Sequence, residues 1–115
     1  MRKFKVEVTV TKEYEVEVDE NIINEDFRKN FESYMWQLND DDTQEAFAKA
    51  LAEQSARFGV NEFIEGFGRC AESKEYADVW NASDYNKDRK CTEGLYIYEA
   101  NEYVESEAEE VESFD

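Results

Sequence analysis

The side chains that most often perform covalent chemistry are absent or isolated in this chain of 115 residues. There is no histidine. An imidazole base is therefore excluded, and with it Ser-His-Asp and Cys-His catalysis and every metal site that contains histidine. Cys70 and Cys91 are 21 positions apart and form no CxxC motif. We expect two reduced, inert thiols, with a disulfide as the less favoured alternative.

Oxygen ligands are abundant, but their spacing does not define a metal site. The segment Asp84-Tyr85-Asn86-Lys87-Asp88 begins like a calcium loop, with side-chain oxygens at its first, third and fifth positions. Arg89 and Leu95 then stand where that loop requires Gly and Glu. Gly66-Phe67-Gly68 lacks the spacing and the Lys of a phosphate-binding loop and predicts a bend. We therefore predict no catalytic residue, no metal and no cofactor.

The charge balance is the most unusual property of the sequence. Thirteen Lys and Arg residues face 30 Asp and Glu residues, which gives a formal net charge of -17. A basic surface for direct nucleic-acid binding is therefore missing. The chain is still not a disordered acidic tail, because eight Phe, seven Tyr and two Trp suffice to build a core. A net charge of about 2–8 keeps a small domain soluble, so the excess suggests a use.

Residues 3–18 predict β-structure with one apolar and one polar face. Apolar residues occupy even positions and polar residues occupy odd positions, a period of two. Two arrangements satisfy this parity. The favoured one is a hairpin with its loop at Thr11-Lys12-Glu13; the alternative is one long strand. The apolar residues are Phe4, Val6, Val8, Val10, Tyr14, Val16 and Val18.

Two helices are predicted next. Asn24 is a suitable cap for a helix from about Glu25 to Leu38, with apolar residues on one face. Asp42, followed three residues later by Glu45, resembles a capping box and begins a second helix. Gly59 is a suitable end for this second helix.

The second half of the chain gives weaker signals. The range 62–68 predicts a short strand or a tight turn, 73–80 a short helix, and 81–93 a polar loop. Leu95 to Tyr98 has strong strand propensity. The range 102–115 is expected to be a frayed acidic tail or a short helix. Together these elements predict one α+β domain over 1–115. In it an antiparallel sheet, made of the N-terminal β-hairpin and a C-terminal strand, packs its Phe4/Val6/Val8/Val10 face against two α-helices.

No run of about 18 apolar residues exists, and the basic N-terminus is not followed by an apolar segment. We therefore expect neither a membrane span nor a secretory signal, and a cytoplasmic protein.

Glu13, Glu15 and Glu17 repeat every second residue, so a strand would place their side chains on one face, about 6.6–6.8 Å apart. Asp19 continues the spacing. Such a row of carboxylates imitates a row of phosphates and fits a basic groove. The predicted partner-binding residues are Glu13, Glu15, Glu17, Asp40, Asp41, Asp42, Glu102, Glu105, Glu107, Glu109 and Glu110.

In small size, acidity, aromatic content and lack of a catalytic motif, the chain resembles the small acidic inhibitors of bacteriophages and mobile elements. These include DNA-mimic, anti-restriction and anti-CRISPR proteins. The resemblance implies an inhibitor in the cytoplasm of a bacterial host. Its partner would be a basic nucleic-acid-binding protein, such as a defence nuclease or its DNA-reading subunit.

Two alternatives stay open. One is a protein–protein interaction module that binds through exposed aromatic residues, with Trp80, Tyr96 and Tyr98 as candidates. The other, less favoured, is an enzyme that uses carboxylates and a divalent metal.

Overall fold

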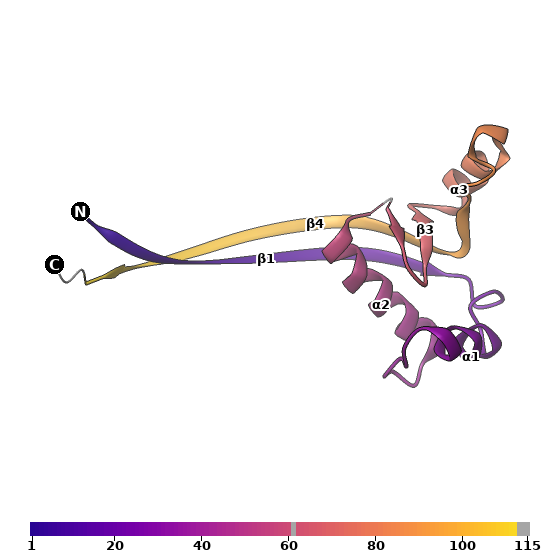
Figure 1. The fold of residues 1–115 in the computed structure, drawn as a ribbon, viewed down its shortest axis with the longest axis horizontal. Coiled ribbons are helices and arrows are strands. Elements are labelled where there is room, and N and C mark those ends of the chain that lie inside the picture. Colours follow the sequence, from indigo (N-terminus) through magenta and orange to yellow (C-terminus); the bar gives the residue numbers. More distant parts are fainter. Residues whose placement is uncertain (61, 113–115) are drawn as a thin grey trace.

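The computed structural model describes residues 1–60 and 62–112. Its four-stranded sheet has the order β1-β4-β3-β2 and is combined with α-helices, which confirms the α+β class. Strand β1 (Lys3–Val18) runs antiparallel to β4 (Cys91–Val111). Strand β3 (Gly68–Ala71) is parallel to β4, and β2 (Phe63–Ile64) is antiparallel to β3. Figure 1 shows β1 and β4 leaving the body together as a long two-stranded ribbon.

The prediction of an N-terminal hairpin is wrong, and the alternative of one long strand is confirmed. Residues Thr11, Lys12 and Glu13 lie within β1 and pair with residues 103, 102 and 101 of β4. The predicted loop lacks the Gly or Asn that a three-residue turn prefers, whereas β4 offers a partner strand of 21 residues. One irregularity remains, because the register shifts between Glu13 and Tyr14 and leaves Ala100 unpaired.

Both predicted helix starts are confirmed. Helix α1 (Glu25–Tyr34) begins after Asn24, whose side-chain oxygen accepts the Phe27 N–H at 3.0 Å. It ends four residues before the predicted Leu38. The chain after Tyr34 turns back towards α1, where the Leu38 N–H donates to the Glu32 carboxylate at 2.8 Å.

Helix α2 (Thr43–Phe58) begins after Asp42, whose carboxylate accepts the Glu45 N–H at 3.1 Å. Gly59 follows with a φ of 92°, a conformation that favours glycine.

The weaker predictions for the second half are partly confirmed. The range 62–68 contains both a short strand and a tight turn, and helix α3 (Lys74–Ala82) is capped by Ser73. The polar loop contains one turn of 3₁₀-helix (Asp84–Asn86). The prediction of a frayed tail or helix from 102 onward is wrong for Glu102–Val111, which belong to β4. Residues 113–115 lie outside the described residues.

The core lies at the body end of the ribbon. The aromatic residues of this core, Phe31, Phe47 and Phe67, are at most 3 % exposed and meet with ring centroids 5.1–6.4 Å apart. The apolar face of β1 reaches this core only through Tyr14, Val16 and Val18. The prediction that the helices cover Phe4, Val6, Val8 and Val10 is therefore wrong, because β1 extends beyond the helices.

A second, smaller cluster holds α3 against the sheet. It contains Ala71, Ala77, Cys91 and Tyr96, with Trp80 packed beside it. Trp80 Nε1 donates to the Arg89 carbonyl at 2.7 Å, which ties α3 to the segment that leads into β4.

Candidate functional site

The segment of the ribbon beyond the body is called the arm, defined as residues 3–13 of β1 and 101–111 of β4. Successive side chains of a strand point to opposite faces, and paired residues share a face. Odd-numbered residues of β1 and their partners in β4 therefore form one face, which we call the acidic face and follow to Glu17. Its carboxylates, all exposed, are Glu7, Glu13, Glu15, Glu17, Glu105, Glu107 and Glu109.

The structure brings six of the eleven predicted partner-binding residues onto this face. They are Glu13, Glu15, Glu17, Glu105, Glu107 and Glu109. The prediction missed Glu7, which pairs with Glu107. Its odd position was the signal that could have found it.

The other five predicted residues lie elsewhere. Glu102 and Glu110 point to the opposite face, because they pair with Lys12 and Phe4. Asp40–Asp42 lie in the connection between α1 and α2. The core residues of these two helices pack against Tyr14, Val16 and Val18, which are on the opposite face of β1. Asp19 is also outside the row, since it begins a turn after β1.

Two of these five carboxylates are in ion pairs. Arg2 donates to both oxygens of Glu110, at 2.9 and 3.2 Å, and lowers the pKa of that carboxyl. Lys49 contacts Asp40 at 3.1 Å, and the pKa of Lys49 is raised by this contact. Both pairs are exposed, so they contribute little stability.

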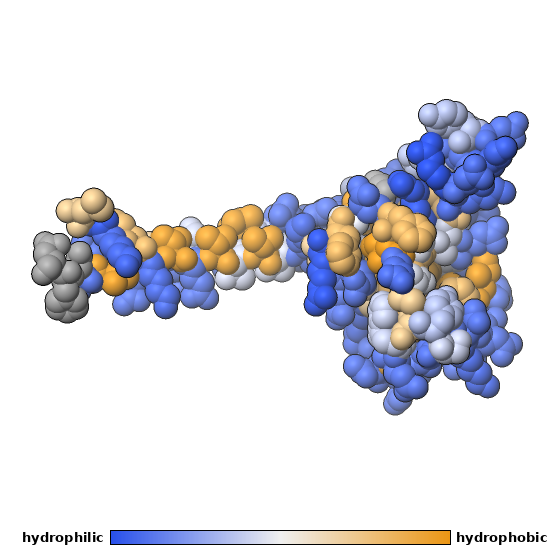
Figure 2. Space-filling view, in the orientation of Figure 1, coloured by the Kyte–Doolittle hydropathy of each residue, from blue (hydrophilic) through white to orange (hydrophobic). Residues whose placement is uncertain are grey.

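The opposite face of the arm carries a stripe of apolar side chains, and nothing within the described residues covers it. Phe4, Val6, Val8 and Val10 are 47–57 % exposed, and Val104 is 64 % exposed. Ala108, the partner of Val6, lies between them. Figure 2 shows these apolar side chains as a stripe along the arm. An exposed apolar stripe of this length is typical of an interaction surface. The period of two had indicated these residues, but as buried ones.

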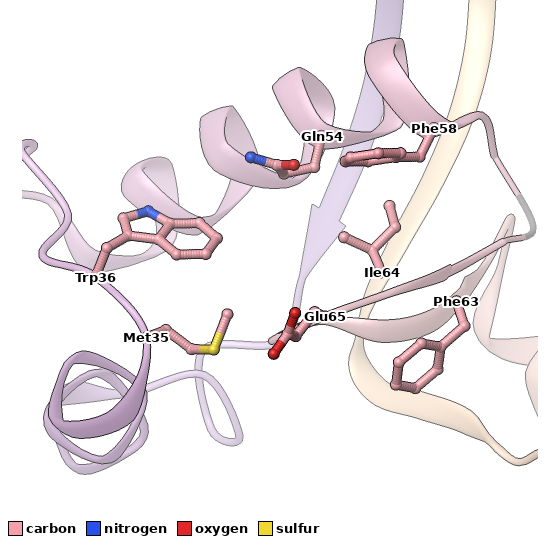
Figure 3. A pocket seen from close by; sticks show the side chains of 7 residues that line it. All are labelled: Met35, Trp36, Gln54, Phe58, Phe63, Ile64 and Glu65. Atoms are coloured by element: carbon pink, nitrogen blue, oxygen red, sulfur yellow. The ribbon is translucent and has the colours of Figure 1, made fainter.

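The body carries a separate open pocket of about 730 Å³. Its lining side chains, drawn in Figure 3, come from the segment directly after α1, the second half of α2, and strand β2 with the residue that follows it. The side chains are mostly apolar, with one carboxylate and one amide among them. The lining residues are Met35, Trp36, Gln54, Phe58, Phe63, Ile64 and Glu65. Its size suits a small apolar ligand or an apolar side chain of a partner.

The three aromatic residues that the alternative hypothesis named differ in exposure. Tyr96 is 7 % exposed and belongs to the small cluster under α3. Trp80 is half-buried beside it. Tyr98 is 52 % exposed and lies on the acidic face as the partner of Glu15. Of the three, only Tyr98 offers an exposed ring to a partner.

Sites for metal or thiol chemistry gain no support from the geometry. Across residues 1–60 and 62–112, no three His, Cys, Asp or Glu side chains gather in a way that would hold a metal ion. Asn86, in the segment that began like a calcium loop, is buried and donates to the Trp80 carbonyl. Cys70 and Cys91 are buried free thiols, and burial raises the pKa of Cys70 to about 12. A thiol with this pKa is a poor nucleophile at neutral pH.

Comparison with known proteins gave no relative: no family model, curated protein or solved structure matches this chain. Among the described residues, the helices are too short or too polar to cross a lipid bilayer. The fold and the surfaces describe an α+β body with a two-stranded arm that has an acidic face and, on the opposite face, an exposed apolar stripe.

Proposed function

We propose that this protein is a non-catalytic acidic inhibitor that binds a nucleic-acid-binding protein and occupies its basic groove by mimicry of DNA. The observation that carries the proposal is the acidic face between Glu7 and Glu17. Six carboxylates lie along it, and its basic residues, Lys3 and Lys5, lie beyond this segment. Lys12 lies on the opposite face.

The spacing of these charges indicates which nucleic acid they imitate. Ten residue steps of a strand span about 33 Å, so the six carboxylates provide roughly one charge per 5–6 Å. One DNA strand carries one charge per ~3.4 Å of helix axis, and the duplex one per ~1.7 Å. The acidic face thus approaches the density of a single strand and is far below that of a duplex. We expect the target to be a groove lined by Lys and Arg that holds one strand.

Strand structure gives the charges a fixed geometry. Each carboxylate projects from a backbone that is paired over the whole arm, so the spacing of the row is set by the ribbon. A groove that recognises phosphates by Lys and Arg would gain comparable contacts from this row. Complementary charge also speeds encounter, so association should be fast at low salt and weaken as salt rises.

A second function, a protein–protein interaction module without mimicry, is favoured by the exposed apolar stripe of the arm. Phe4, Val6, Val8 and Val10 would bind an apolar surface, and the acidity would then serve solubility. The two functions differ in salt dependence. Apolar contact is insensitive to screening, whereas contact through carboxylates is weakened by it.

The experiment compares three proteins, each immobilised and exposed to a nuclease-treated bacterial lysate, followed by elution in a salt gradient. The first is the unaltered chain. The second is an acidic-face variant, in which five carboxylates become glutamine: Glu13, Glu15, Glu17, Glu105 and Glu107. The third is a charge-matched control, in which five exposed acids away from that face become the corresponding amides: Glu20, Asp26, Asp41, Glu53 and Glu62.

Mimicry predicts that nucleic-acid-binding proteins elute from the unaltered chain and the control at moderate salt, and fail to bind the acidic-face variant. A labelled single-stranded oligonucleotide should also displace them. If both variants lose binding equally, net charge alone is responsible and the mimicry proposal fails. Retention at high salt by all three proteins would favour the apolar module.

A further inference from the structure

Strand β1 is an edge strand, and one side of its backbone has no strand partner within the described residues. The sheet order places β4 on its other side. All side chains from Lys3 to Glu13 are exposed, so no other part of the described chain covers this segment. Long exposed edges pair readily with another strand, and proteins ordinarily shield them. A two-stranded ribbon is also only marginally stable by itself, so further pairing would stabilise the arm.

The charges of β1 differ from those of the rest of the chain. Strand β1 contains three basic and four acidic residues, so its net charge is only -1 in a protein of net charge -17. The basic residues Arg2, Lys3 and Lys5 lie at its start, and Glu13, Glu15 and Glu17 lie at its end.

Strand β4 is strongly acidic, since it contains seven Glu and no basic residue. Two copies of β4 would therefore repel each other. Two copies of β1 in antiparallel orientation would bring the basic start of each strand beside the acidic end of the other.

We propose that β1 pairs with β1 of a second copy of this chain, antiparallel and about a two-fold axis at Thr9. In this register Lys3 faces Glu15 of the second copy, and Lys5 faces Glu13. Symmetry repeats each pair, which makes four opposite-charge pairs on one face of the new sheet. On the other face Val8 meets Val10 of the second copy.

Neighbouring registers are less favourable. With the axis at Val8, Lys5 faces Thr11 and Phe4 faces Lys12, so two of the four charge pairs are lost. With the axis at Val10, Glu7 faces Glu13, and the symmetric pair repeats this repulsion. Like charges directly opposite each other destabilise a sheet. Of the three registers, the one at Thr9 is therefore the one that keeps all four opposite-charge pairs and places no like charges opposite each other.

The shape of the protein is compatible with this arrangement. About 13 residues of each strand would overlap, mostly in the arm, and the two bodies would lie at opposite ends of a sheet with the order β4-β1-β1-β4. In each copy the body lies at the end of β1 where Tyr14, Val16 and Val18 pack against the core. Figure 1 shows that the body occupies only one end of the ribbon. Main-chain hydrogen bonds would supply affinity, as in other cases where a strand is added to a sheet edge.

A pair of cysteine variants tests the register. Facing residues of antiparallel strands lie within reach of a disulfide, so Thr9→Cys should cross-link two copies under mild oxidation. In the control, Thr11→Cys, the two thiols would be four residues apart along the strands, about 13 Å, and should not cross-link. Both threonines are exposed on the same face, while the native Cys70 and Cys91 are buried. A dimer band on a non-reducing gel for the first variant only is the expected result.

Charge variants test the pairing without new thiols. Sedimentation equilibrium at about 0.15 M salt should show a dimer. The double variant Lys3→Glu with Lys5→Glu should raise the dissociation constant of the dimer at least ~10-fold, and so should Glu13→Lys with Glu15→Lys. The four changes together should restore the dimer, because each pair is then reversed. Circular dichroism checks that the variants are folded. A monomer at all concentrations, or failure of the fourfold variant to recover, would overturn the proposal.

Discussion

The contrast between Val8 and Val16 gives a sharp stability test of where the core ends. Both valines lie in β1 on the same face, but Val8 is 57 % exposed on the arm, whereas Val16 packs against the core. Threonine has the shape and the strand preference of valine, and differs by a hydroxyl in place of a methyl group. For Val16→Thr the lost methyl burial and the poorly hydrogen-bonded hydroxyl together cost about 2 kcal/mol. For Val8→Thr the hydroxyl stays in water, and the cost should be below ~0.5 kcal/mol.

Urea unfolding at micromolar concentration, followed by tryptophan fluorescence, measures both values. Trp36 is a suitable reporter, because its ring lies 5.3 Å from that of Phe31 in the core. In thermal unfolding followed by the same fluorescence signal, Val16→Thr should lower the midpoint temperature by roughly 8 °C, and Val8→Thr by less than ~2 °C. Equal losses would refute the reasoning, because they would mean that the arm is buried to the same degree as the body.

Three further stability predictions follow from single contacts. The pKa of the Cys70 thiol is about 12 in the folded protein, against an ordinary value of 9.0, so the unfolded chain loses this proton first as the pH rises. The free energy of unfolding should therefore fall by up to ~1.4 kcal/mol per pH unit above pH 9. Urea midpoints measured from pH 8 to 11 should fall less steeply for Cys70→Ala than for the unaltered chain. Gly94→Ala should cost more than ~2 kcal/mol in the same assay, because φ is +90° and the added methyl would lie 3.0 Å from Ile22 Cγ2. Asp42→Ala should cost ~1 kcal/mol through loss of the α2 cap, and Asp41→Ala, which removes no cap, below ~0.5 kcal/mol.

The features that the sequence predicted correctly are the local ones. Asn24, Asp42 and Ser73 cap helices through contacts three residues away, so a short window of sequence contains all that determines them. The assignment of odd and even residues of β1 to opposite faces was also correct. Its topology was not, because the same period of two describes a hairpin and a single strand equally well. Only the partner strand, whose paired residues are 77 or more positions away along the chain, distinguishes the two.

The candidate site shows the same division. The row Glu13, Glu15 and Glu17 could be read from spacing alone. The position of Glu105 and Glu107 beside Glu7 depends on the register between β1 and β4, to which a bulge contributes, and spacing cannot supply it. The error about the apolar face has another cause. Periodicity identifies which side chains share a face, but burial depends on whether another element is long enough to cover that face.

The proposed dimer and the proposed mimicry both use the carboxylates of Glu13 and Glu15, and one carboxylate cannot serve both contacts at once. In the dimer, Glu13 and Glu15 face Lys5 and Lys3 of the second copy, so two carboxylates of the acidic face are neutralised. Self-association should therefore compete with binding to a basic groove. The double variant Lys3→Glu with Lys5→Glu should be monomeric, and it keeps every carboxylate of the acidic face. It should therefore bind a groove protein identified from the lysate at least as tightly as the unaltered chain does. The advantage should grow at protein concentrations at which the unaltered chain is dimeric. Weaker binding by this variant would mean that the dimer is the binding form, and that the two faces act together rather than in competition.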